Sequence, residues 1–143
     1  MPVFGEGDAP QAVARELAGG GCAVYAWARD RAEARRKREG DPGAESAARA
    51  FRDVLRAVRE SGFSGAYAAF GGDTLACLAQ EMGVRWIRPL RQAAPGVVEA
   101  LAGTDSGAFT LYTKSGNLGP DDVMERLLEL CGKEEDEACG TCT

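Results

Sequence analysis

The chain contains no histidine, and this absence removes the side chain that proteins use most often as a general base and as a metal ligand. Triads of serine, histidine and aspartate are therefore excluded, as are histidine-rich zinc sites. Cysteine is scarce and odd in number, with five residues, two of which lie within apolar patterns. We therefore do not expect a disulfide framework.

Long apolar runs and an excess of basic residues are missing as well. No stretch approaches a membrane span, and the first residues lack the basic, apolar and small-residue pattern of a signal peptide. The formal net charge of −5 argues against nucleic acid as the main partner, because duplex binding requires a basic surface. We therefore expect a cytoplasmic globular protein with no membrane partner, and its 143 residues fit one domain.

Strand-like apolar runs alternate with helical patterns, which is typical of an α/β fold. The expected helices cover residues 8–17, 45–60, 73–82 and 121–130, and the expected strands cover residues 22–28, 65–70, 84–90, 97–101 and 108–113. The run at 22–28 is continuously apolar, as in a strand buried on both faces. We predict a single three-layer domain over residues 1–132, with a mostly parallel or mixed sheet and helices on both faces.

Two charged segments remain outside this pattern. Residues 29–39 are dense in arginine, lysine and acidic residues, and they form either a solvated loop or helix or a basic lip near a phosphate site. Residues 133–143 form an acidic tail that ends in a Cys-x-x-Cys motif at residues 139–142. The motif has no second cysteine pair and no preceding strand, so we do not expect it to bind metal or to do redox chemistry.

The most informative stretch is Gly71-Gly72-Asp73-Thr74, where a strand pattern changes to a helical one. Paired glycines allow a sharp turn and a close approach by a ligand, and the free N–H groups of a helix start attract anions. Asp73 or Thr74 is placed to cap the helix, and Asp73 can instead hold Mg²⁺. An ordinary tight turn with an N-cap is the alternative interpretation.

A second glycine-rich stretch, Thr113-Lys114-Ser115-Gly116-Asn117-Leu118-Gly119, also follows a strand pattern and precedes a helix. Two such loops at the carboxyl ends of strands can face one crevice, where open α/β sheets bind ligands. Lys114 can neutralise phosphate charge or form a salt bridge with the Asp121-Asp122 turn. The stretch is not a Walker A loop, because no glycine directly precedes the lysine.

These motifs, with the Pro95-Gly96 turn between them, resemble the C-terminal nucleotide-binding domain of the four-carbon acid sugar kinases, most specifically over residues 65–130. That family phosphorylates threonate, erythronate and 3-oxo-tetronate with ATP. The resemblance implies that ATP, with Mg²⁺ at Asp73, binds at a set of loop residues. These are Gly71, Gly72, Asp73, Thr74, Gly96, Lys114, Ser115, Gly116, Asn117 and Gly119.

The sequence departs from the family in two ways. Ala26-Trp27-Ala28 stands where members usually carry a small hydroxyl residue after the first strand, and we expect the family's N-terminal substrate domain to be absent. We therefore expect the ATP-binding half of an acid-sugar kinase, whose catalytic base is unknown and which needs a separate substrate-domain chain for turnover. The alternatives are a stand-alone regulatory or interaction module, with an exposed apolar patch and self-association as a homo-oligomer, and a remnant without a ligand.

Overall fold

The computed structural model describes residues 1–28, 30–40, 45–115 and 122–130. In this part of the chain the strands form a four-stranded mixed sheet of order β3-β6-β5-β4 and a separate parallel pair, β1-β2. The strands are β1 (Val3–Phe4), β2 (Val24–Tyr25), β3 (Tyr67–Phe70), β4 (Trp86–Ala94), β5 (Val97–Thr104) and β6 (Gly107–Lys114). Strands β3 and β6 are parallel, whereas β5 is antiparallel to both β6 and β4. The prediction of a mixed sheet is confirmed.

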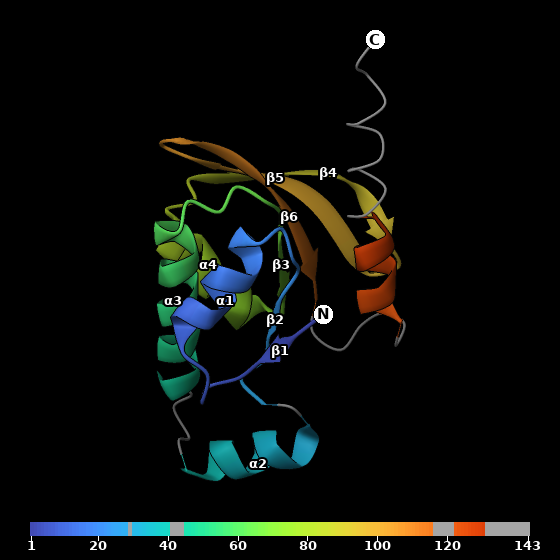
Figure 1. Cartoon of the computed structure of the whole chain (residues 1–143). Coiled ribbons are helices and arrows are strands. Elements are labelled where there is room, and N and C mark those ends of the chain that lie inside the picture. Colours follow the sequence, from blue (N-terminus) through green and yellow to red (C-terminus); the bar gives the residue numbers. More distant parts are fainter. Residues whose placement is uncertain (29, 41–44, 116–121, 131–143) are drawn as a thin grey trace.

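Helices lie on both faces of the larger sheet, so the predicted layering is also confirmed (Figure 1). The labelled helices are α1 (Pro10–Ala18), α2 (Arg31–Gly40), α3 (Glu45–Glu60) and α4 (Gly72–Met82), and a further helical stretch covers residues 123–130. Leu78 of α4 packs with Ala69 and Leu111 on one sheet face. Val123 and Leu127 of the 123–130 stretch pack on the opposite face.

Helix α3 has the bounds that its apolar periodicity predicts. Val54 and Val58 are buried from this helix against Val13 and Ala14 of α1. Two exposed arginines of this helix also contact α4. Arg56 Nε lies 3.2 Å from a carboxylate oxygen of Glu81, and Arg59 donates a hydrogen bond of 2.9 Å to the Glu81 backbone carbonyl, which fastens α3 to α4.

The strands differ in extent from the prediction. Only Val24–Tyr25 of the expected strand 22–28 forms β2, and both residues are half-buried rather than fully buried. Strands β4 and β5 continue further than expected because they pair with each other as a long hairpin. The Pro95-Gly96 turn joins them, and Gly96 has a φ of +76°, which suits glycine.

The outer strand β4 is exposed over most of its length. Trp86, Ile87 and Leu90 are exposed at 47%, 39% and 52%. Trp86 and Ile87 are consecutive in the strand and therefore point to opposite faces of the sheet. These three residues and the exposed Val98 on β5 thus do not establish the apolar patch that the interaction-module hypothesis predicts.

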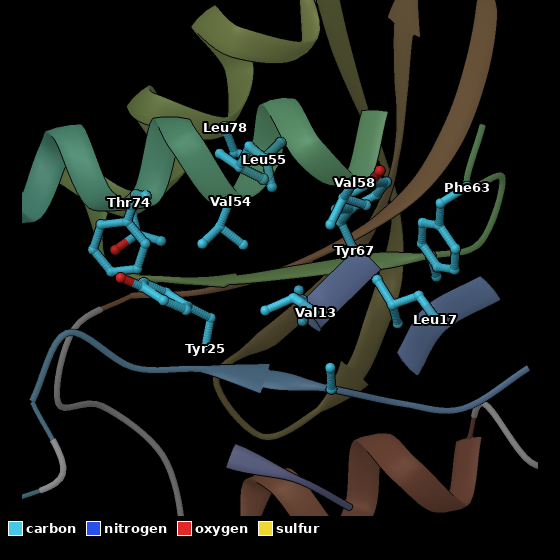
Figure 2. A pocket seen from close by; sticks show the side chains of 14 residues that line it. Val13, Leu17, Tyr25, Val54, Leu55, Val58, Phe63, Tyr67, Thr74 and Leu78 are labelled. Carbon is cyan, nitrogen blue, oxygen red and sulfur yellow. The ribbon is translucent and has the colours of Figure 1, made fainter. Parts of the chain in front are cut away.

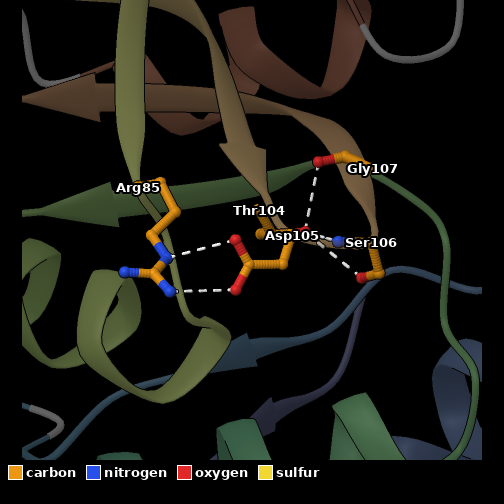
Figure 3. A network of polar contacts seen from close by, with 5 residues as sticks. All are labelled: Arg85, Thr104, Asp105, Ser106 and Gly107. Atoms are coloured by element: carbon orange, nitrogen blue, oxygen red, sulfur yellow. Dashed lines mark hydrogen bonds and ion pairs between the residues drawn. The ribbon is translucent and has the colours of Figure 1, made fainter.

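The β5–β6 turn is fastened by polar contacts at the end of the sheet where β6 begins (Figure 3). Thr104 Oγ1 donates to the Gly107 carbonyl oxygen at 3.1 Å and accepts from the Ser106 backbone N–H at 3.3 Å. Arg85 makes two contacts to the Asp105 carboxylate, of 3.2 Å and 3.0 Å. These groups are exposed, and they stabilise the turn that residues 104–107 predict.

The charged segment after β2 is helix α2, which has no buried residue. Lys37 fastens it to the rest of the domain, because its Nζ lies 3.1 Å from Glu6 and donates to the Trp27 carbonyl oxygen. Within the helix the same Nζ lies 3.2 Å from Glu33. Partial burial opposes the charged form of Lys37, but the hydrogen bonds that it donates to both carboxylates raise its pKa above the ordinary value. No helix among residues 1–28, 30–40, 45–115 and 122–130 has the length and apolarity required to cross a bilayer.

Candidate nucleotide site

Gly71 makes the turn from β3 into α4. Its φ of +93° and ψ of 150° lie in a region that is essentially restricted to glycine. The helix begins directly after it, and the Leu75 N–H donates to the Gly71 carbonyl oxygen at 3.1 Å. Gly71 is therefore the residue of the glycine pair that the turn requires.

The prediction that Asp73 or Thr74 caps this helix is wrong. The N-cap is Gly71, no side chain forms a capping hydrogen bond, and Asp73 and Thr74 lie within the first turn. The N-cap is the earlier residue Gly71 because glycine can adopt the backbone conformation that this position requires. The first-turn N–H groups consequently have no side-chain cap, and a helix start of this kind attracts anions.

The pairing of β3 with β6 brings the second predicted loop to the first. Phe70 lies opposite Lys114 in the parallel ladder, and the Gly71 N–H donates to the Lys114 carbonyl oxygen at 3.0 Å. Ser115 follows Lys114 directly. Two stretches that lie more than forty residues apart in the sequence are therefore joined by a hydrogen bond at the carboxyl ends of their strands.

Gly96 lies at the same edge of the sheet. Val97 is the register partner of Lys114, so the Pro95-Gly96 turn is next to the end of β6. Beneath this edge Phe70 packs against the cluster that contains Val97. Gly71, Gly72, Asp73, Thr74, Gly96, Lys114 and Ser115 are thus gathered at one edge. Gly116, Asn117 and Gly119 lie outside the described residues. So does Asp121, one of the two aspartates of the Asp121-Asp122 turn that is the alternative partner of Lys114.

Among the predicted site residues that the structure describes, Asp73 is the one that carries a carboxylate. Asp73 is exposed in the first turn of α4, and no group of three or more potential ligands of the types His, Cys, Asp and Glu occurs in the described part of the chain. Mg²⁺ is commonly held by one or two carboxylates together with substrate phosphates. A single exposed Asp73 fits that arrangement, although it does not form a metal site by itself.

A cavity of about 170 Å³ adjoins this edge, and the sequence did not indicate it. It lies between α1, β2, α3 and β3, and Thr74 of α4 also lines it (Figure 2). Its aromatic lining residues are Tyr25, Phe51, Phe63 and Tyr67. They come from separate elements, so no spacing along the chain could have joined them before the fold was known.

A model of the family described as nucleotide-binding C-terminal domain matches residues 7–124. The chain belongs to this family. The family assignment made from the glycine motifs is therefore confirmed, and with it the general role of the domain as a nucleotide-binding one. A search of curated proteins gave no match.

Solved structures share the fold. A Haemophilus influenzae protein has a TM-score of 0.64 at 22% identity, covering 87% of this chain and 33% of its own. A domain of unknown function from Bordetella bronchiseptica, a domain-swapped dimer with bound citrate, has a TM-score of 0.57 at 22% identity, covering 87% of this chain and 31% of its own. A Salmonella typhimurium LT2 protein has a TM-score of 0.66 at 17% identity, and the match covers 88% of this chain and 34% of that protein. The chain thus spans about a third of the length of each of these proteins.

Proposed function

We propose that this domain binds ATP with Mg²⁺ as the nucleotide-binding half of a kinase for four-carbon acid sugars of the threonate, erythronate or 3-oxo-tetronate type. The observation that carries the proposal is the hydrogen bond from Gly71 to Lys114, which joins both glycine-rich stretches at the carboxyl edge of the sheet. Family membership supports nucleotide binding. The choice of sugar rests on the sequence resemblance.

The described groups suit phosphoryl transfer. This reaction depends on positioning and on charge neutralisation more than on covalent chemistry, so a site without histidine can support it. The uncapped first turn of α4 would bind phosphate oxygens through its backbone N–H groups. Lys114 would neutralise charge on the phosphates, and Asp73 would hold Mg²⁺, which supplies further neutralisation when bound.

The isolated chain should bind ATP without turning it over on a sugar. The chain spans a third of the solved relatives, and we place the sugar-binding groups and the catalytic base on a separate substrate domain. Adding that domain as a separate chain should restore transfer to a tetronic acid. An assay on a small panel of tetronic acids, with and without the added chain, tests this part of the proposal.

Calorimetric titration with ATP and Mg²⁺ tests the binding site itself. Lys114→Ala should weaken ATP binding about ten- to hundredfold, because a hydrogen bond to a charged group contributes about 1.5–3 kcal/mol. Arg85→Ala is a matched control, since it also removes one positive charge but lies at the other end of the sheet, beside Asp105. Equal effects of the two substitutions would reject a specific role for Lys114.

Asp73→Asn tests the metal role separately. It should reduce the gain in ATP affinity that Mg²⁺ provides, while binding of ATP without Mg²⁺ should be unchanged or stronger because a negative charge is removed. An unchanged response to Mg²⁺ would remove Asp73 as the ligand. An absence of heat with ATP under every condition would leave only the remnant hypothesis.

A second candidate function is a stand-alone nucleotide-binding module that contacts a partner. It is favoured by the exposed apolar side chains of the outer strand β4, which are Trp86, Ile87 and Leu90. The two functions differ in one measurable respect. A module would bind ATP and form a complex, but it would show no phosphate transfer when a substrate domain is supplied.

A further inference from the structure

The cavity beside the glycine turn has the size of one ring system rather than of a whole nucleotide. Its volume is about 170 Å³, and an engineered apolar cavity of about 150 Å³ is large enough to hold a benzene molecule. Sites that enclose a complete drug-sized ligand begin at about 300 Å³. Any ligand that enters this cavity would therefore insert one flat group and leave its remainder outside.

The lining favours an aromatic and mostly apolar group. Val13, Leu17, Val54 and Val58 supply aliphatic walls from α1 and α3, and Tyr25 and Phe51 stack edge to face with ring centroids 5.3 Å apart. Phosphate or the hydroxyls of a sugar acid would lose their hydrogen bonds against such walls. A planar base would keep its dispersion contacts and stack on the rings.

The cavity is continuous with the proposed phosphate site through Thr74. This residue lines the cavity and also belongs to the first turn of α4, two residues after Gly72. Figure 2 shows Tyr25 and Thr74 at the same end of the cavity. A nucleotide whose phosphates contact the Gly71–Thr74 turn would therefore have its base close to the end of the cavity that Thr74 lines.

Tyr67 lines the cavity with its ring rather than with its hydroxyl. The hydroxyl oxygen is buried and has no hydrogen-bond partner among the described residues. A ligand in the cavity would therefore contact the aromatic ring of Tyr67.

We propose that this cavity is the base-binding subsite of the domain, and that it receives the purine ring of the nucleotide whose phosphates bind at Gly71–Thr74. The inference rests on the proposed nucleotide function. It adds the residues that contact the base, with Tyr25 and Phe51 as the stacking pair, and Val54 and the ring of Tyr67 as walls.

Filling the cavity tests the inference. Val54→Phe places a ring in the space from α3, and Ala23→Leu fills it from the opposite wall on the β2 side. Val98→Phe is a matched control on the exposed surface of β5. Each variant is titrated calorimetrically with ATP, with adenosine and with inorganic tripolyphosphate, after thermal unfolding has shown that it is folded. The second filling variant gives the answer if the first does not fold.

We expect each filling variant to weaken ATP and adenosine binding roughly 5- to 150-fold, the range that corresponds to one stacked base. Tripolyphosphate binding should stay at the wild-type value, and Val98→Phe should change none of the three. Wild-type affinities for ATP and adenosine in both filling variants would overturn the base subsite while leaving the phosphate site intact. In the wild-type chain, ATP binding no tighter than tripolyphosphate would also overturn it, and no binding of any of the three would instead reject the proposed function.

Discussion

Replacing Gly71 by alanine should destabilise the domain, whereas replacing its neighbour Gly72 should not. A Cβ atom at either position would meet no atom within 4 Å, so neither substitution creates a clash with neighbouring atoms. The difference lies in the backbone. Gly71 has a φ of +93° and a ψ of 150°, and holding alanine in such a region costs about 1–3 kcal/mol.

Gly72 is the matched control because it is the first residue of α4 and has no positive φ. Alanine favours a helix over glycine, so Gly72→Ala should be neutral or should stabilise the fold by up to about 1 kcal/mol. Each kcal/mol shifts the unfolding temperature of a chain of this size by about 2–4 °C. Gly71→Ala should therefore lower the unfolding temperature, whereas Gly72→Ala should raise it or leave it unchanged.

Thermal unfolding followed by circular dichroism, with urea titration for the free energy, measures both effects. Gly71→Ala should also weaken ATP binding, because its N–H holds the Lys114 carbonyl that begins the second loop. Equal unfolding temperatures for the two variants would refute the argument. Such a result would mean that the turn relaxes into another conformation without cost, and that Gly71 does not fix the geometry of the site.

Three further predictions concern stability, measured as the free energy of unfolding. Arg91→Met should cost about 1–3 kcal/mol, because Arg91 Nε lies 2.6 Å from the Glu99 carboxylate and Glu99 is only 8% exposed. Adding Glu99→Gln should recover part of that loss, and a lack of recovery would contradict the explanation. Gly83→Ala should cost about 1–2 kcal/mol, since Gly83 ends α4 in the left-handed region, and Gly83→Asn should cost less. Burial raises the pKa of Tyr67 above 10.0, so the folded chain keeps this proton when the unfolded chain loses it, and stability falls as pH rises above that value. Tyr67→Phe should make that alkaline decline shallower, and an identical pH profile would show that Tyr67 does not contribute to it.

The sequence was most informative where a local pattern decides the structure. Helix α3 follows from the periodicity of its apolar side chains, and its bounds are those predicted. The Gly71–Gly72 turn and the Pro95-Gly96 turn follow from residues whose backbone preferences are unusual. In these segments the preference of each residue agrees with the final fold.

The sequence did not indicate which distant segments pair with one another. The expected strand 22–28 is reduced to Val24–Tyr25, because β2 pairs only with the two-residue β1 in the described part of the chain. Strands β4 and β5 are longer than predicted because each extends along the other. An apolar run indicates that a segment can be extended, but the available partner sets how far the strand continues.

The candidate site was predictable as a set of loops but not as a complete pocket. Two glycine motifs, each after a strand, predicted a common edge, and the β3–β6 pairing places Gly71 beside Lys114. The capping role of Asp73 or Thr74 was wrong because cap position depends on the conformation at Gly71. The cavity could not be predicted, because Tyr25, Phe51 and Tyr67 are brought together only by tertiary packing.

The outer strand β4 determines how another surface can approach the domain. Pro89 has no N–H to offer at the free edge, and the register of β4 against β5 shifts between Pro89 and Arg91 and again between Gln92 and Ala94. A further strand would find an interrupted row of donors and acceptors there. The exposed side chains of β4 are therefore suited to contact with the side chains of a partner rather than to pairing with an additional strand that prolongs the sheet.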